Sequence, residues 1–466
     1  MTASAASDGV PTGRRRAAPE GGGTPSRSGV SRVIRAVALV LLLAACDGLG
    51  RPVVGTRPVP DGGDDRTCEV TPACVPVRSA DPSSFMVPLE RRTPPVRRDC
   101  DADGVDDERD NCIGVPNEEQ DPRVCAAAAA DCSRLLAGAT NLAGADLRGC
   151  RIDALSAPAG LTLRGANLRC ASLAFTMPEA AQMEALDVSQ ANLTGATLSF
   201  ESEAAIVVDL GRSELRDTFV RASGGVRLRA RESVLASSTL VLEPGGRSHD
   251  PAPALELTAS DVDSVAIYEA PAAWPGRVRI ERSAMRATTL DVAVLDLVGG
   301  TVLTSNVGAS ELFALDVELT TSAVSARYAA FSMSDLRDVI FARCEDLHLT
   351  GGVLLDVDFP LCEPDRLRIV ESEVVGARIA GGLWLIESTL SSSILGGGPV
   401  STVHTEEAAL DAVTICDLGA AAFRGGELRC VKCEEDAFMN GTSVCLAGTR
   451  IFERGCPAIE LAPECP

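Results

Sequence analysis

The sequence predicts an all-β solenoid, and two features of its residue pattern lead to that prediction. Between Asn141 and Ser199 a large apolar residue recurs every five positions, and a small residue stands two positions before it. A period of five fits neither an α-helix, at about 3.6 residues, nor a β-strand, at about 2. It is typical of a chain that turns a corner every five residues, with the large residue inward and the small one in the tight space beside it. Four such units close a square coil, and stacked coils build a solenoid.

The strict form of the motif is Ala, then Asp or Asn, then Leu, as at Ala145–Leu147, Ala166–Leu168 and Ala191–Leu193. The predicted inward residues of this segment are Leu142, Leu147, Ile152, Leu163, Leu168, Leu173, Val188, Leu193 and Leu198. The motif resembles that of the pentapeptide-repeat family. The resemblance implies the fold of that family, a right-handed quadrilateral β-helix.

The five-residue spacing continues after residue 199 in a weaker form. Pairs of apolar residues five apart recur at Leu210/Leu215, Leu235/Leu240, Met285/Leu290, Leu312/Val317, Leu336/Phe341, Leu354/Phe359, Val374/Ile379, Leu390/Leu395 and Leu410/Ile415. We therefore predict one continuous β-helix over residues 132–428. A pectate-lyase-like β-helix and a β-sandwich remain alternatives for the later part, because alternating Val and Leu also suit those folds.

The N-terminal segment predicts where in the cell the protein is located. Arg32 and Arg35 precede an apolar run at 36–45, which is too short to span a bilayer and matches the apolar region of an export signal. The run ends in Leu43-Ala44-Ala45-Cys46, which resembles a bacterial lipobox. The resemblance implies a lipid on Cys46 and a place in the cell envelope, at the outer membrane or surface rather than the inner membrane. The alternative is an ordinary signal with a chance cysteine.

An acidic segment follows a linker (46–98) that is rich in Pro, Gly, Arg and Asp and has no apolar period. It carries carboxylates at positions one, three, five, nine and twelve and glycine at position six: Asp99, Asp101, Asp103, Asp107, Asp110 and Gly104. Ca²⁺ takes six to eight hard oxygen ligands, and a glycine allows the sharp turn that brings them together. The spacing therefore predicts a calcium loop, with a solvated acidic linker as the alternative.

The segment 99–125 resembles a thrombospondin type 3 repeat, a pattern that Asn117 and Gln120 complete. The resemblance implies one or a few structural Ca²⁺ ions, with a further ligand from the carbonyl of Val105. Two departures weaken the implied affinity. Ile113 stands where the family usually has proline, and a single repeat lacks the ligands that stacked repeats share.

The cysteines predict disulfides. The chain has 17 cysteines, so an even number remains beside Cys46, and an exported protein meets an oxidising compartment. The pair Cys430 and Cys433 has the spacing of zinc ligands, but with no histidine nearby we favour disulfides in a Cys-rich C-terminal cap. Cys344 and Cys362 both follow a phenylalanine by three residues, which places them at equivalent positions on adjacent coils. Stacked coils lie about 4.8 Å apart, so we predict a bond between these two.

Composition bears on function mainly by exclusion. A net charge of −22 argues against binding to a nucleic-acid backbone, and the three histidines are scattered along the chain as surface histidines would be. We expect a non-enzymatic, calcium-stabilised lipoprotein that presents a scaffolding or adhesive surface to an unknown protein or polysaccharide. One alternative is a polysaccharide-acting enzyme, which needs several carboxylates and an arginine on one flank. A DNA-mimicking topoisomerase inhibitor is a remote alternative, because an export signal separates it from a cytoplasmic target.

The expected organisation has five parts: a lipoprotein signal (1–45), a flexible linker (46–98), a calcium repeat (99–125), a β-helix (132–428) and a Cys-rich cap (429–466).

Overall fold

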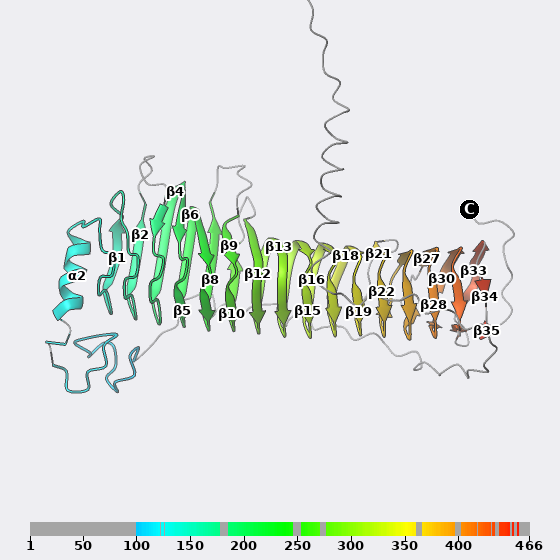
Figure 1. Cartoon of the computed structure of the whole chain (residues 1–466), viewed down its shortest axis with the longest axis horizontal. Helices are drawn as coiled ribbons and strands as arrows, with labels where there is room; N and C mark the ends of the chain where they lie inside the picture. Colours follow the sequence, from blue (N-terminus) through cyan, green and yellow to red (C-terminus); the bar gives the residue numbers. More distant parts are fainter. Residues whose placement is uncertain are drawn as a thin grey trace, which may run out of the picture. The chain divides into compact units, whose positions relative to one another are not determined.

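The computed structural model describes residues 99–455 apart from 122, 125, 178–184, 246–252, 271–275, 360–365, 397–401, 417, 430, 434–437, 448–449 and 452–453. All of them belong to one compact unit of the chain, Thr67–Pro466. Apart from helix α2 (Ala126–Leu136), the regular elements among them are parallel strands that stack coil upon coil in one sheet (Figure 1). The predicted all-β solenoid is therefore confirmed. No helix in the described part is long and apolar enough to cross a membrane.

Each coil contributes in turn to three ladders of parallel pairings, named A, B and C here. Ladder A contains β1 (Arg151–Ser156), β2 (Ser172–Thr176), the starts of β4 (Thr197–Asp209) and β6 (Phe219–Arg231), β8 (Thr239–Pro244), β11 (Ala266–Glu269), the starts of β13 (Thr289–Leu303), β14 (Asn306–Leu315), β16 (Ala323–Ser332) and β18 (Ile340–Thr350), β20 (Asp358–Phe359), β23 (Arg378–Ile379), β26 (Ile394–Gly396), β29 (Thr414–Cys416), β32 (Val431–Cys433) and β35 (Arg454–Gly455).

Ladder B contains β3 (Ala185–Asp187), the later parts of β4, β6, β13, β14, β16 and β18, β9 (Leu255–Thr258), the start of β12 (Arg277–Arg286), β21 (Leu367–Val370), β24 (Leu383–Ile386), β27 (Thr402–Glu406), β30 (Leu418–Arg424) and β33 (Phe438–Ala447). Ladder C contains β5 (Glu214–Arg216), β7 (Val234–Ala236), β10 (Asp261–Asp263), the ends of β12 and β13, β15 (Glu318–Thr320), β17 (Asp335–Arg337), β19 (Val353–Leu355), β22 (Glu373–Val375), β25 (Thr389–Ser391), β28 (Ala409–Asp411), β31 (Glu427–Arg429) and β34 (Arg450–Ile451). The pairings thus continue into the segment predicted as the cap.

The core is a column of apolar side chains inside the coils. Every predicted inward residue of the strict segment is buried, and so are both members of each later pair. In ladder C, for example, Leu336 lies between Leu319 and Leu354 of the adjacent coils. Aromatic rings stack in the same way, with 5.2 Å between the ring centroids of Phe341 and Phe359. The five-residue spacing therefore identified the inward face correctly in both parts of the chain.

Coil length varies along the chain. Ser172 pairs with Thr197, which lies 25 residues later, whereas Asn306 pairs with Ala323, only 17 residues later. The shorter coils contain long strands such as β14 and β16, which pass from ladder A to ladder B without a break. A repeat length that changes from coil to coil explains why the motif blurs after residue 199.

Corners of the strict segment are closed β-turns. At one of them the backbone N–H of Ala166 donates to the carbonyl of Leu163 at 2.9 Å, and Gly165 between them has a φ of +67°. A left-handed residue at the third position is what a type II turn requires. The same turn bond joins Ala145 to Leu142, Ala171 to Leu168 and Ala196 to Leu193.

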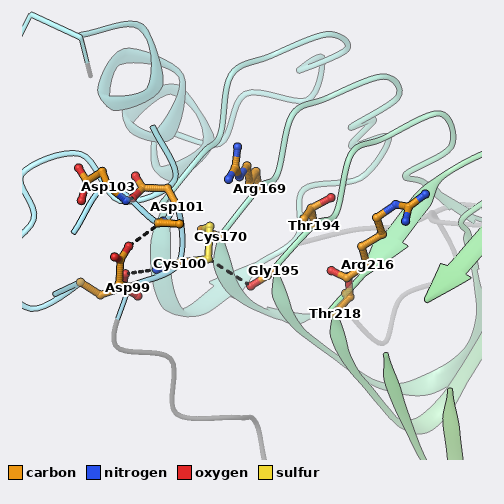
Figure 2. Close-up of a disulfide and its surroundings, with 12 residues drawn as sticks. Asp99, Cys100, Asp101, Asp103, Arg169, Cys170, Thr194, Gly195, Arg216 and Thr218 are labelled. Atoms are coloured by element: carbon orange, nitrogen blue, oxygen red, sulfur yellow. Dashed lines mark hydrogen bonds between the residues drawn. A yellow bond between two sulfur atoms is a disulfide. The ribbon is translucent and has the colours of Figure 1, made fainter. Parts of the chain in front are cut away.

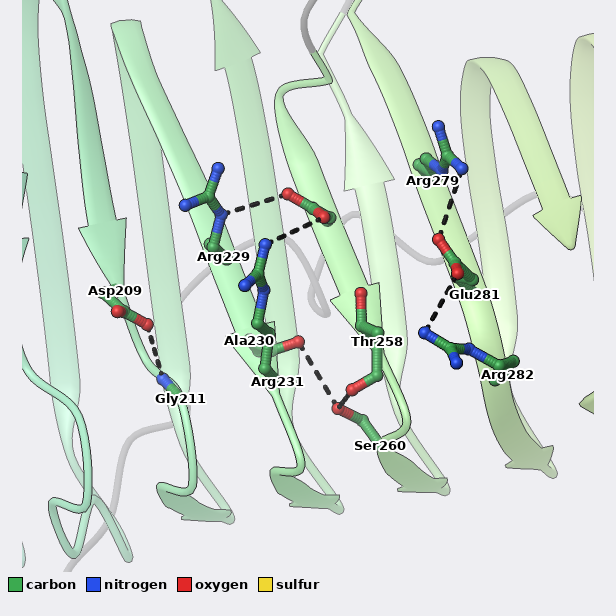
Figure 3. Close-up of polar contacts among 11 residues, drawn as sticks. Asp209, Gly211, Arg229, Ala230, Arg231, Thr258, Ser260, Arg279, Glu281 and Arg282 are labelled. Carbon is green, nitrogen blue, oxygen red and sulfur yellow. Dashed lines mark hydrogen bonds and ion pairs between the residues drawn. The ribbon is translucent and has the colours of Figure 1, made fainter.

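Many corners of the later coils are held by a hydroxyl group instead. Ser305 accepts a hydrogen bond from the backbone N–H of Thr288 in the preceding coil at 3.1 Å and donates to the carbonyl of Leu303 at 2.7 Å. At another corner the Ser260 hydroxyl lies between the carbonyls of Ala230 and Thr258 (Figure 3). Such hydroxyls satisfy buried backbone groups between coils. Corner N–H groups also donate to the hydroxyls of Ser213, Ser238, Ser260, Ser283, Ser322, Ser334, Ser388 and Ser393.

Helix α2 lies at the N-terminal end of the stack, next to β1, and was not predicted from the sequence (Figure 1). It begins in a run of alanines, the strongest helix formers. Its Leu135 is fully buried in the same hydrophobic cluster as Leu142, and a disulfide joins Cys132 to Cys150. A capping element of this kind shields the first coil, whose ladders would otherwise end in open hydrogen-bonding edges.

Candidate metal centre and outer flank

The acidic segment is fastened to the first coils of the solenoid (Figure 2). Cys100 forms a disulfide with Cys170, and their Cα atoms lie 6.0 Å apart. Nearby, Gly149 has a φ of +63°, and a Cβ atom added there would lie 2.0 Å from the carbonyl oxygen of Ile113. Only glycine fits such a close approach of two backbones. The segment is therefore part of the folded N-terminal end of the solenoid.

Three predicted ligands, Asp99, Asp101 and Asp103, form a carboxylate cluster. Each offers one carboxylate oxygen within 4.8 Å of the other two. Backbone amides orient them: Gly104 donates to Asp99 Oδ2 at 2.9 Å, and Val105 donates to Asp103 Oδ1 at 2.8 Å. Gly104 has a φ of +88°, as the sharp turn of such a loop requires. Hard carboxylate oxygens that lie this close together are suited to binding Ca²⁺.

The charge of the Asp101 carboxylate is only partly compensated, by a hydrogen bond from the Asp103 N–H to Oδ1 at 3.3 Å. The Oδ2 atom of Asp101 is buried without a hydrogen-bond partner among the described residues, and the same holds for Oδ2 of Asp110. Burial raises the pKa of Asp101, and the negative charges of Asp103, Asp110 and Asp99 raise it further. A divalent cation would supply the missing positive charge, so these donors fit a Ca²⁺ ion.

The other predicted ligands have different surroundings. Asp107 accepts a hydrogen bond from the Cys100 N–H at 2.8 Å, and its second oxygen faces Arg151 at 3.3 Å. Asp110 accepts from the Cys112 N–H at 2.7 Å through Oδ1 only. Asp107 therefore ties the loop to β1, whereas Asp110 keeps an unpartnered oxygen near the cluster.

Asn117 and Gln120, which complete the sequence pattern, close the loop on itself. The backbone N–H of Asn117 donates to Asp103 Oδ2 at 2.9 Å, and Gln120 Oε1 accepts from the N–H of Asn111 at 2.8 Å. These contacts hold the second half of the segment against the carboxylate cluster.

Two predicted sites reach outside the described residues: the lipidation site Cys46 and the Cys344–Cys362 bond, whose Cys362 is not described. Both stay predictions. The two phenylalanines used to align the pair, Phe341 and Phe359, do stack on adjacent coils.

A second group of polar residues gathers on the outward side of ladder B. A cavity of 310 Å³ there is lined by Glu311, Glu345, Asp346, Arg327, Arg366 and Tyr328. Four of its charges are paired: Arg327 lies 3.2 Å from Glu345, and Arg366 lies 3.6 Å from Asp346. Hydrogen bonds from Arg327 and Arg343 lower the pKa of Glu345. This flank gathers the residue types that the enzymatic alternative requires.

The flank was missed in the sequence because its residues belong to different coils. His348 and His404 stand far apart in the chain, yet the register of ladder B places both in one outward column, with Arg368 and Trp384 between them. The aromatic residues themselves were visible in the sequence. Their common face depended on the coil registration, which the spacing alone did not supply.

Comparison with known proteins adds little beyond the fold. No protein-family model and no curated protein matches this chain. Among solved structures, a match is HetL, a pentapeptide repeat protein involved in heterocyst differentiation regulation from the cyanobacterium Nostoc sp.. It is 14% identical, and the match covers 62% of this chain and 94% of that chain with a TM-score of 0.15, which is too low to support an argument. The chain's own geometry thus identifies it as a parallel β-solenoid with pentapeptide-type repeats in its first coils.

Proposed function

We propose that the protein is a non-enzymatic scaffold of the bacterial cell envelope, lipid-anchored through Cys46, whose solenoid is stabilised at its N-terminal end by Ca²⁺. The observation that carries the proposal is the carboxylate cluster of Asp99, Asp101 and Asp103, fastened to the first coils by the Cys100–Cys170 bond. An ion bound there would hold the loop, and the loop would in turn cover the first coil.

Calcium binding is tested on the full chain. Asp101→Asn combined with Asp103→Asn removes two charges from the cluster, and a matched control, Asp106→Asn with Glu108→Gln, removes two exposed charges from the same loop. Millimolar Ca²⁺ should protect peptides of residues 99–121 from hydrogen exchange in the wild type and the control. At a Ca²⁺ concentration 100 times the dissociation constant, the free energy of opening this segment should rise by about 2.7 kcal/mol. Equal exchange with Ca²⁺ and with chelator in the wild type would refute the calcium site.

The anchor is tested by mass spectrometry of the mature N-terminus. Lipid on Cys46 is expected, and Cys46→Ser should accumulate precursor or release the protein from the membrane fraction. A mature terminus at another residue without lipid rules out the anchor.

The enzymatic alternative is supported by the carboxylates and arginines around Tyr328, but one of these carboxylates, Glu345, is ion-paired with arginine. A general acid in glycoside cleavage needs a raised pKa. The pKa of Glu345 is lowered by its arginine partners, Arg327 first, so this carboxylate is poorly suited to act as a general acid. We therefore propose that the flank binds a partner without transforming it.

A further inference from the structure

Six side chains form a continuous strip on the outward side of ladder B, called the aromatic strip here: Phe313, Tyr328, His348, Arg368, Trp384 and His404. The ring centroid of Tyr328 lies 5.6 Å from that of Phe313 and 5.9 Å from that of His348. The Arg368 guanidinium lies 5.8 Å from the Trp384 ring, which stacks on His404 at 4.8 Å. The strip therefore crosses successive coils in the stacking direction.

Aromatic residues are scarce in this protein, so their gathering on one surface is informative. The chain has only two tyrosines and two tryptophans. Tyr268 is buried, whereas Tyr328 and Trp384 are half-exposed and both belong to the strip. Phe313 is one of the few large apolar side chains that are exposed in the described part, at 36%.

The strip is confined to one part of the face. On earlier coils, the outward positions of ladder B hold ion pairs such as Arg229 with Glu256 and Arg279 with Glu281 (Figure 3). Such pairs suffice for a solvated surface, and no aromatic ring accompanies them at the described ladder B positions of those coils. Stacked rings first appear beside the ion pairs at β14, which indicates a separate role for the later coils.

Two cavities accompany the strip, and each combines a ring with charged groups of both signs. The 310 Å³ cavity at Tyr328 is described above, and a second cavity of 110 Å³ is lined by Trp384, His404, Glu406 and Arg424. The larger cavity is in the range of ligand sites, and the smaller one lies further along ladder B. Since neither sign of charge dominates, neither a polyanion nor a polycation is favoured as the partner.

A sugar chain matches this combination. Its ring C–H face stacks on an aromatic ring, and its hydroxyls both donate to carboxylates and accept from guanidinium groups. Tyr328 and Trp384 are three coils apart, a separation of about 14 Å at one strand spacing per coil, so a ligand reaching both must be extended.

We infer that the aromatic strip binds a linear, neutral polysaccharide that lies along the stacking direction. The inference deepens the proposed function, because it names the partner of the binding flank, and it rests on the proposal that this flank binds rather than cleaves.

The test uses the full chain and four soluble probes: the neutral mixed-linkage β-glucan, glucomannan and xylan, and the charged polygalacturonate. Affinity electrophoresis would compare the wild type with Tyr328→Ala and Trp384→Ala. At least one neutral probe should bind, and each alanine variant should weaken binding about tenfold or more through loss of a stacked ring. Tyr328→Phe and Trp384→Phe keep a ring and should bind within about threefold of the wild type. Val234→Ala, at an exposed site of ladder C, should leave binding unchanged.

The outcomes separate the two proposals. Absence of binding to every neutral probe, preference for polygalacturonate, or full binding by both alanine variants overturns the polysaccharide site and leaves the calcium-stabilised scaffold intact. Binding with release of new reducing ends supports the polysaccharide site but overturns the non-enzymatic function. Self-association that disappears in the alanine variants, without glycan binding, would assign the strip to a second copy and overturn the inference.

Discussion

The coils of residues 141–199 and the coils after residue 213 build the same corner with different chemistry. In both, a residue with left-handed backbone precedes a buried residue, as Gly165 precedes Ala166 and Thr304 precedes Ser305. The alanine corners at Ala145, Ala166, Ala171 and Ala196 satisfy their N–H within their own turn, whereas the serine corner receives the N–H of the preceding coil. Ala191, at the boundary between the two regions, is the exception, because its N–H donates to the hydroxyl of Ser213. The first solution is local in sequence and the second is not.

This difference explains which part of the chain has a legible motif. In the strict segment the second motif residue also acts locally: the side chain of Asn192 accepts from the N–H of Thr194 at 3.1 Å, as an Asx turn does. Alanine, asparagine, leucine and glycine of the motif thus all make their contacts within a single turn. In the later coils the acceptor is a hydroxyl 16 to 27 residues away, so no short spacing records it.

The inward leucines are common to both regions, and their loss should have the largest effect. Leu168→Ala and Leu336→Ala should each cost about 2–5 kcal/mol, since both side chains are fully buried inside the coils. Hydrogen exchange of the affected coils would measure the loss, with Val234→Ala as a control. A difference of more than about 2 kcal/mol between the two variants would show that the two regions also differ in their core.

The corner hydroxyl should distinguish the regions. Ser305→Ala leaves the buried N–H of Thr288 without its acceptor and should cost about 1–3 kcal/mol. The converse change, Ala171→Ser, should be close to neutral because the N–H at that corner is already bonded within its turn. Exchange rates of the Thr288 amide give the first value, and Ser310→Ala, an exposed serine of the same coil, is the matched control. Equal losses of stability in Ser305→Ala and Ala171→Ser would contradict the proposed difference between the two kinds of corner.

The left-handed corner residue should have a smaller effect of opposite sign in the two regions. Gly165→Thr introduces a β-branched residue at a φ of +67° with no atom within 4 Å of its Cβ, so only backbone strain of about 1–2 kcal/mol is expected. Thr304 already bears such strain at a φ of +50°, so Thr304→Gly should be neutral or stabilising by up to about 1 kcal/mol. Thermal midpoints would measure both, and a loss in Thr304→Gly would show that its side chain supports the corner.

The smallest expected effect is electrostatic and confined to the strict segment. A hydrogen bond from Arg148 lowers the pKa of Asp146, so the pair stabilises the fold above the ordinary value of 3.8. This contribution is lost as the pH falls through the lowered pKa. Asp146→Asn should therefore cost up to about 1 kcal/mol at pH 7 and nothing in strong acid, a difference that denaturant midpoints at several pH values would detect. A cost independent of pH would assign the role of Asp146 to hydrogen bonding alone.

Sequence spacing determined the inward face, the solenoid class and the set of acidic residues in the loop. These features are local: Leu168 follows Leu163 by one turn, and Asp99, Asp101 and Asp103 lie within five residues. The helix at 126–136 was visible only as an alanine run, and its role as a cap depended on where Leu135 packs.

Tertiary structure decided what lies side by side across coils. The partners of Cys150 and Cys170, the hydroxyl acceptors at the later corners and the strip from Phe313 to His404 all depend on coil registration. Coils vary from 16 to 27 residues, so a single insertion shifts every later pairing. A five-residue spacing records which way a side chain points, but neighbours along a solenoid are set by the accumulated length of every coil between them.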